Sequence, residues 1–125
     1  MIGPEGNPSM TDNETTVAQL RRRIADFVRR RDWGQFHDPK NLSASIAIEA
    51  AELMEHFQWL RSDQVMEVRN DPQAMAQIGE ELADILAFAL SFANALEIDV
   101  SSTLAAKLEK NETKYPADRY YGRFR

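Results

Sequence analysis

The stretch that decides the fold is residues 70–96, NDPQAMAQIGEELADILAFALSFANAL. It opens with Asp71 and Pro72, a helix-start signal, because Asp caps free N–H groups and Pro has no N–H to leave unpaired at the first helical position. From position 82 to 96 only three residues are polar: Asp84, Ser91 and Asn94. A helix that is apolar on nearly every side must be covered on several faces. Because a chain of 125 residues has few helices to do this, we expect an obligate homo-oligomer with this helix at its centre.

Three further helices follow from the spacing of apolar residues. We expect them over about residues 16–32, 42–60 and 101–114, with a short helical piece after Ser62. The expected N-caps are Thr16, in a capping box with Gln19, for the first helix and Asn41 or Ser43 for the second. No segment shows the alternation typical of a strand. The sequence therefore predicts an all-α bundle of four to five helices.

Composition favours one folded domain with two short ends. We assign residues 1–13 to a disordered leader, 14–118 to the domain and 119–125 to a basic and aromatic tail. With no Cys and two His, the chain has no disulfide, no thiolate zinc site and no His-rich metal centre. The net charge of −5 disfavours binding to a nucleic-acid polymer. No apolar run reaches the ~18 residues of a membrane span, and nothing resembles a signal peptide. We therefore expect a cytoplasmic protein without a membrane partner.

Two acidic pairs with the same spacing lie inside the most apolar helical stretches, Glu49-Ala-Ala-Glu52 and Glu81-Leu-Ala-Asp84. A buried carboxylate costs several kcal/mol unless something compensates its charge. Neither stretch contains a Lys or Arg. A divalent cation bound by oxygen ligands, Mg²⁺ or Mn²⁺, is the simplest compensation. The sequence therefore predicts a metal site, formed by both pairs.

The two pairs also have matching orientations on their helices. A helix advances about 100° per residue, and each helix has an expected apolar stripe. The stripes are Ile46, Ala50, Leu53, Phe57 and Leu60 on the second helix, and Ile78, Leu82, Ile85, Ala89 and Leu96 on the third. On each helix the first acid lies about 60° and the second about 120° to the same side of the stripe. We therefore expect the pairs to meet around one cavity.

Other interpretations remain open from the residues alone. The acids can be ordinary surface residues of amphipathic helices, and the runs Arg21–Arg23 and Arg29–Arg31 are best explained as solvated surface. His56 falls near Glu49 and fits a supporting or surface role better than a ligand role. A non-enzymatic oligomerisation or adaptor module would explain the apolar third helix, but not the matched acids. A di-iron site is disfavoured because it needs Glu-x-x-His pairs.

The chain resembles a known family. The pattern ExxE, a gap of 28 residues, then ExxD is similar to the all-α nucleotide pyrophosphohydrolases of the MazG type. Three flanking segments extend the resemblance to their dCTP-pyrophosphatase branch and cover residues 15–118. They are Arg31-Asp-Trp-Gly-Gln-Phe-His37, Glu55-His-Phe-Gln-Trp59 and Lys107-Leu-Glu-Lys-Asn-Glu-Thr-Lys-Tyr-Pro116.

The resemblance implies an activity and the residues that carry it. It implies Mg²⁺-dependent hydrolysis of dCTP, or of a related or modified pyrimidine deoxynucleotide, to the monophosphate and pyrophosphate. The implied metal ligands are Glu49, Glu52, Glu81 and Asp84, with Glu49 or Glu52 as general base. The implied substrate contacts are Trp33, His37, Trp59 and Phe88 around the base, and Lys107, Asn111, Lys114 and Tyr115 at the phosphates or nucleotide. Family members are homodimers or homotetramers.

The chain departs from the animal dCTP enzymes at two positions. Those enzymes carry His where this chain has Ile24, and Tyr where it has Phe88. Neither Ile nor Phe can donate a side-chain hydrogen bond. We therefore expect the metal chemistry to be kept, while recognition of the base can differ.

Overall fold

The computed structural model describes residues 10–123. The first nine residues of the expected leader therefore lie outside the described part. The elements, in order, are α1 (Val17–Arg30), the 3-10 helix η2 (Trp33–Phe36), α2 (Pro39–Glu55), the 3-10 helix η3 (Val65–Asn70), α3 (Pro72–Leu96), α4 (Val100–Lys114) and α5 (Ala117–Tyr120). Within residues 10–123 there is no β-strand, so the all-α prediction is confirmed.

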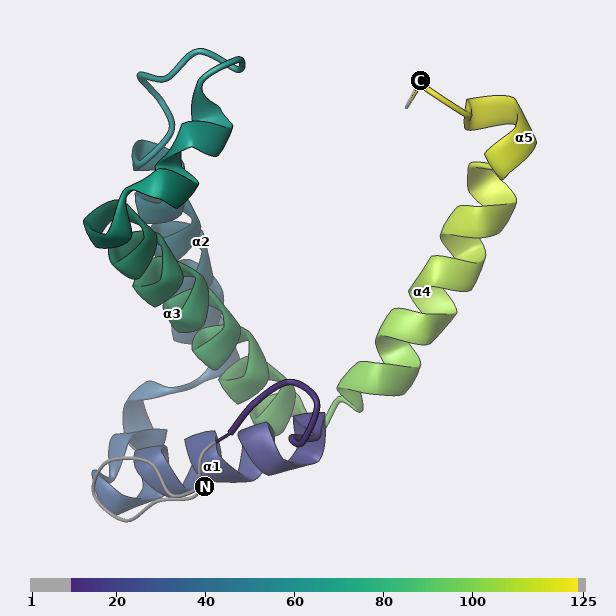
Figure 1. The fold of residues 1–125 in the computed structure, drawn as a ribbon. Coiled ribbons are helices and arrows are strands. Elements are labelled where there is room, and N and C mark those ends of the chain that lie inside the picture. Colours follow the sequence, from purple (N-terminus) through teal and green to yellow (C-terminus); the bar gives the residue numbers. More distant parts are fainter. Residues whose placement is uncertain (1–9, 124–125) are drawn as a thin grey trace.

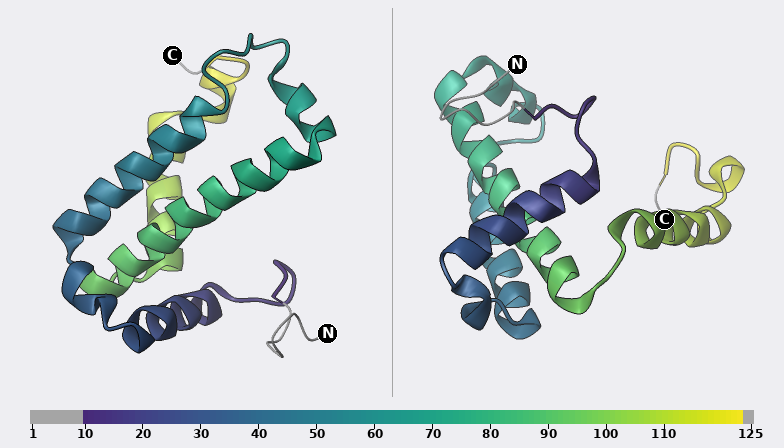
Figure 2. Two further views of the ribbon diagram at one scale, coloured as in Figure 1. Left: turned by 90° about the vertical axis from the view of Figure 1, so that its left-hand side faces the viewer. Right: turned by 90° about the horizontal axis from the view of Figure 1, so that it is seen from below.

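The helices α2 and α3 form an antiparallel hairpin, which is the main packing unit of the chain (Figure 1). The helix α1 lies across the C-terminal end of α3 and packs against it. The helix α4 leaves α3 at a bend of 102° and points away from the hairpin, as Figure 1 and the right-hand view of Figure 2 show. One copy of the chain is therefore an open assembly, with a helical hairpin on one side and α4 on the other.

Two of the predicted helix starts are confirmed. Thr16 and Gln19 form the capping box of α1, and the Asp71 side chain accepts hydrogen bonds from the first turn of α3. The start of the second helix was predicted wrongly. It begins at Pro39 with Asp38 as N-cap, so it uses the same Asp-Pro signal as α3. It also ends at Glu55 rather than at residue 60, because residues 56–60 form turns.

The packed faces of the hairpin differ from the predicted stripes. On α2 the buried and half-buried residues are Pro39, Leu42, Ser45, Ile46, Glu49 and Leu53, and on the first half of α3 they are Ala74, Ile78, Glu81 and Ile85. Four residues of the predicted stripes are exposed: Ala50, Leu60, Leu82 and Leu96. The reason is that both helices are apolar over a wide arc, so periodicity alone does not select the face that meets a neighbour. The first acid of each pair therefore lies between the helices rather than beside their contact.

A single copy buries very little apolar surface. Among residues 10–123 the only fully buried apolar side chains are Leu42 and Ala93. Five leucines of α3 and α4 are about half exposed: Leu82, Leu86, Leu96, Leu104 and Leu108. Exposed apolar surface of this extent is more typical of a contact site than of a solvated face.

No helix in the described residues has the length and apolar composition to cross a membrane by itself. The helices α3 and α4 meet that criterion only when taken as one bent pair. This is weak evidence of a span, because the core helix of a folded domain meets the same criterion.

Candidate functional site

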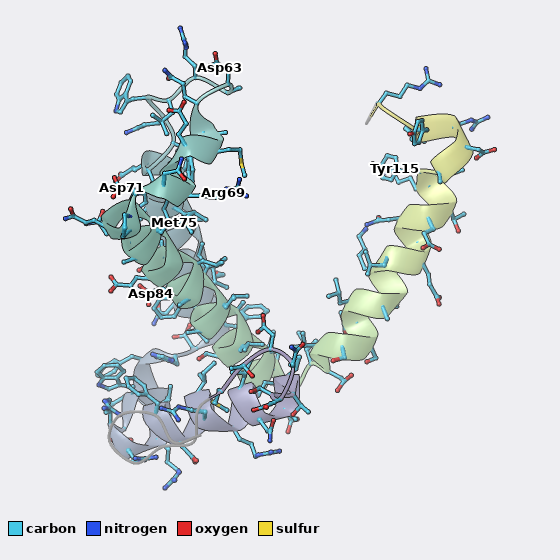
Figure 3. All side chains as sticks on the ribbon, in the orientation of Figure 1. Asp63, Arg69, Asp71, Met75, Asp84 and Tyr115 are labelled. Carbon is cyan, nitrogen blue, oxygen red and sulfur yellow. The ribbon has the colours of Figure 1, made fainter. Side chains whose placement is uncertain are left out.

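Three acids meet where α2 and α3 face each other. Glu49 and Glu52 come from α2 and Glu81 comes from α3, and one carboxylate oxygen of each lies within 4.8 Å of the others. Asp84 lies one turn beyond Glu81 on the exposed side of α3 (Figure 3). On each helix the first acid of the pair is half-buried and the second is exposed. The two pairs thus have equivalent orientations, as the spacing predicted.

The acid cluster is electrostatically uncompensated. Among residues 10–123, no Lys or Arg forms an ion pair with any of the four acids. One oxygen each of Glu49 and Glu81 is buried without a hydrogen-bond partner. Burial, a hydrogen bond with Glu81 and the negative charge of Glu52 together raise the pKa of Glu49 to about 7. Within the described residues, a proton shared between carboxyl groups is therefore the main way to reduce the repulsion between these carboxylates.

This donor set fits a hard divalent cation. The ligand atoms are carboxylate oxygens, which Mg²⁺ and Mn²⁺ prefer, and they converge on one point from two helices. His56, at the C-terminal end of α2, lies with its Nε2 4.0 Å from Glu81 Oε1. This position beside the cluster suits a residue that orients the Glu81 carboxylate rather than one that binds the metal in place of Glu81.

A cavity of about 910 Å³ lies next to the acids, between α1, η2 and α3. Its wall includes Ile24 and Phe27 of α1, Trp33 of η2, His37, and Asp84 and Phe88 of α3. Asp84 therefore belongs to both features, since it comes from the second acidic pair and also faces the cavity. A ligand with an aromatic part and an anionic part, bridged to the acids by a cation, matches this arrangement.

The aromatic side chains of the cavity form a continuous row. The ring centroids of Phe27 and Trp33 are 5.7 Å apart with an edge-to-face geometry, those of Trp33 and His37 are 6.4 Å apart, and those of His37 and Phe88 are 6.3 Å apart. The guanidinium of Arg31 lies 3.7 Å above the Phe27 ring. His37 Nδ1 is buried and has no hydrogen-bond partner. It is therefore a buried, unpartnered polar atom within an otherwise apolar row.

Comparison with known proteins agrees with this geometry. The sequence model of the MazG-like family matches residues 44–123, which include both acidic pairs. The chain belongs to the MazG-like family. The dCTP pyrophosphatase 1 of Bos taurus is 34% identical over 109 residues, covering 87% of this chain and 64% of the relative. That of Homo sapiens is 35% identical over 104 residues, covering 83% and 61%. The chain thus spans less than two thirds of the length of these relatives.

A solved structure supports the same fold for this MazG-like chain. The crystal structure of a pyrophosphatase from Archaeoglobus fulgidus superimposes with a TM-score of 0.75 at 38% sequence identity. The match covers 86% of this chain and 99% of the other. The all-helical MazG-like architecture is therefore shared over nearly the whole of that protein.

One copy of the MazG-like chain does not bring all the predicted site residues together. Trp33 precedes α2, whereas Trp59 follows it and is 88% exposed. The 17 residues of α2 separate these two ends by about 25 Å. The predicted phosphate contacts Lys107, Asn111, Lys114 and Tyr115 come from α4 and its end, far from Asp84, as the labelled Tyr115 shows in Figure 3.

Some residues at the cavity were not selected from the sequence. Phe27 was not singled out, Ile24 was named only as a departure from the animal enzymes, and Arg31 was named only in a solvated run and at the start of the segment that contains Trp33. In the structure Phe27 contacts Trp33, and Arg31 covers Phe27 and donates a hydrogen bond to its carbonyl oxygen at 3.1 Å. The only available signal was the closeness of these residues to the Trp33 loop, which does not distinguish a core contact from a ligand contact.

Proposed function

We propose that this chain hydrolyses a nucleoside triphosphate to the monophosphate and pyrophosphate, using Mg²⁺, for which Mn²⁺ can substitute. The proposed substrate is dCTP or a related or modified pyrimidine deoxynucleotide. One observation carries the proposal: a cluster of uncompensated carboxylates that adjoins, through Asp84, a cavity lined by aromatic rings. The names of the relatives, all pyrophosphatases, agree with it.

The four acids would hold the metal ion between α2 and α3. When bound, Mg²⁺ offsets the negative charge of the triphosphate and favours an in-line geometry. Glu49 and Glu81 supply the buried oxygens that have no partner, and Glu52 and Asp84 supply the more exposed ones. The protein thus positions ligands from two rigid helices that pack directly against each other.

The reaction needs a group that accepts a proton from water. The oxygen of a water molecule attacks the α-phosphorus, the bond from that phosphorus to the bridging oxygen breaks, and pyrophosphate leaves. The water proton passes to a carboxylate. Glu49 is the proposed acceptor because its carboxylate lies in the cluster that would hold the ion, beside the water that attacks. Glu52, next to Glu49 in the cluster, is the alternative.

The aromatic cavity would hold the base. Trp33 and Phe88 offer flat faces for stacking, worth about 1–3 kcal/mol per base. His37 Nδ1 is the unpartnered polar atom between them. Because Ile24 and Phe88 cannot donate hydrogen bonds, these two positions would contribute shape and stacking, and polar contacts to the base would come from other residues of the wall, such as His37, Gln19 and Ser91.

A second copy of the chain would complete the site. Lys107, Asn111 and Lys114 do not reach the acids of their own chain, because α4 points away from the hairpin. The half-exposed leucines of α3 and α4 provide the apolar surface for the contact. We therefore propose a homodimer, or a homotetramer of two dimers, in which α4 and Trp59 of one copy approach the cavity of another.

A triphosphate panel tests the proposal. Purified protein is incubated with each dNTP and NTP, with Mg²⁺ or with EDTA, and the products are identified. We expect monophosphate and pyrophosphate with Mg²⁺ only, and loss of both in Glu52→Gln and Asp84→Asn. Glu80→Gln, an exposed acid next to Glu81, is the matched control and should keep full activity. If every triphosphate stays intact with Mg²⁺, the chain is better described as a helical oligomerisation module.

A further inference from the structure

Arg21 of α1 and Asn94 of α3 form a reciprocal pair of hydrogen bonds. Arg21 Nε donates to Asn94 Oδ1 at 2.8 Å, and Asn94 Nδ2 donates to the carbonyl oxygen of Arg21 at 3.2 Å. Among residues 10–123, the other side-chain hydrogen bonds join residues five or fewer positions apart, except for the carboxyl contact of Glu49 with Glu81 between α2 and α3. This pair joins residues 73 positions apart. It is thus the specific polar link that sets how α1 lies on α3.

The pair lies at one end of the contact that lines the cavity. Arg21 is half-buried on the same side of α1 as Ile24, which follows it by one turn and faces the cavity. Asn94 lies one turn beyond Ser91 and about two turns beyond Phe88, both of which face the same cavity. The position of Ile24 relative to Phe88 therefore depends on the register that the pair imposes.

Arg21 also lies close to the beginning of α4. Asp99 is the N-cap of that helix, and its pKa is lowered first by hydrogen bonds from Ser102 and also by the positive charge of Arg21. One guanidinium thus interacts with residues at the meeting point of three helices. A guanidinium suits this position because its planar donors are fixed in direction, whereas a Lys ammonium is a rotating point charge.

Apolar packing alone holds α1 loosely. No residue of α1 is fully buried, and Phe27 is 47% exposed. Non-directional apolar contacts allow a helix to slide or rotate, while paired hydrogen bonds with a charged donor have a defined geometry. The width of the cavity between α1 and α3 is therefore controlled by a polar pair outside it.

We propose that Arg21 and Asn94 are positioning residues for the cavity: their reciprocal hydrogen bonds fix α1 on α3 and so set the distance between Ile24 and Phe27 on one wall and Phe88 on the other. The kinetic part of this inference rests on the proposed function. The structural part does not. Loss of the Arg21–Asn94 hydrogen bonds moves α1 and so weakens substrate binding. The chemical step stays intact because the acids belong to α2 and α3.

The kinetic test compares Arg21→Ala, Asn94→Ala and the double variant. Each single variant should raise KM about fivefold with kcat within about twofold, which is the pattern for lost binding. The double variant should be no worse than the poorer single one, because both lose the same interaction. Arg29→Ala is the matched control, since Arg29 is an exposed Arg of the same helix and, within residues 10–123, its ion pair is with Asp26. Unchanged KM, additive effects, or a fall in kcat at constant KM would overturn the inference.

A second test needs no nucleotide, so its result does not depend on whether the protein is active. Trp59→Phe leaves Trp33, in contact with Phe27, as the single Trp of the chain. In this background Asn94→Ala and Arg21→Lys should increase acrylamide quenching of Trp33 fluorescence, while Arg29→Ala should not. Far-UV circular dichroism verifies that each variant is folded, and Arg21→Lys keeps the charge if Arg21→Ala unfolds. Equal quenching in all variants would overturn the inference, whereas an inactive wild-type protein would overturn only the proposed function.

Discussion

Glu49 on α2 and Glu81 on α3 face each other across the helical hairpin, and each keeps one buried oxygen without a hydrogen-bond partner. Two carboxylates in this relationship repel when both are ionised, and they are relieved by a shared proton or by a cation. The contact between α2 and α3 thus contains two carboxylates whose negative charges and buried oxygens are not balanced by a partner among the described residues.

The metal-free protein should lose stability as the pH rises from about 4.5 to about 7. Glu49 has a pKa of about 7 in the folded chain, against an ordinary value of 4.5. Between these values the folded state binds more protons than the unfolded state, so stability falls with rising pH and levels off above about 7. Urea unfolding in EDTA at several pH values measures this. Glu49→Gln should remove the decline and Glu55→Gln, an exposed acid of the same helix, should retain it. A decline that persists in Glu49→Gln would contradict the assignment.

Without metal, Glu52→Gln should be neutral or stabilising, because it removes repulsion. With metal bound, the wild-type protein should become more stable than Glu52→Gln. Mg²⁺ at 100 times its Kd should stabilise the wild-type protein by about 2.7 kcal/mol, and Glu52→Gln much less. Thermal melts with EDTA and with increasing Mg²⁺ measure both effects, with Glu80→Gln as control. A destabilised metal-free Glu52→Gln would mean that this acid has a structural partner.

Trp33→Ala should weaken nucleotide binding through loss of stacking. A loss of about 1–3 kcal/mol corresponds to a rise in KM of about 5- to 150-fold. Phe88→Tyr, which restores a hydroxyl without removing the ring, should change the ranking of triphosphates more than the overall rate. Kinetics on the full triphosphate panel measure both. An unchanged KM in Trp33→Ala would place the base elsewhere.

The proposed sharing of the site between copies can be tested by mixing inactive variants. Asp84→Asn and Lys114→Ala should each be nearly inactive alone. Unfolded together and refolded as mixed dimers, they should recover about a quarter of the wild-type activity, because half of the randomly formed dimers contain one intact site. Size-exclusion chromatography verifies assembly. If mixing restores nothing although mixed dimers form, α4 does not complete the site of another copy.

The end of α3 carries a local strain that substitution can relieve. Glu97 ends this helix in the left-handed region, with φ of 55°, where Gly is favoured. Glu97→Gly should therefore stabilise the protein by about 1 kcal/mol. The same change at Glu80, an exposed position inside α3, should destabilise it by about 1 kcal/mol. Urea midpoints measure both. A destabilised Glu97→Gly would show that the Glu side chain has a contact worth more than the strain.

Local signals in the sequence determined the helices and the chemistry of the acids. Thr16 with Gln19, and Asp71 with Pro72, predicted two helix starts correctly, because a cap depends on residues three or four positions apart. The same logic applied to Asp38 and Pro39 would have placed the start of α2. Equal spacing also predicted equal orientation for the two acidic pairs, because one helical geometry applies to both.

Only the tertiary structure decided which faces meet and which distant residues become neighbours. Periodicity placed Glu49 and Glu81 beside the apolar stripes, whereas packing put them between α2 and α3. The link between Arg21 and Asn94, and the contact of Phe27 with Trp33 beside the cavity, have no signature in local spacing. The physical reason is the distance along the chain over which each kind of interaction acts. Caps and turns are satisfied within a few residues, whereas a helix that is apolar on several sides has several acceptable neighbours, and only the fit of the whole chain selects among them.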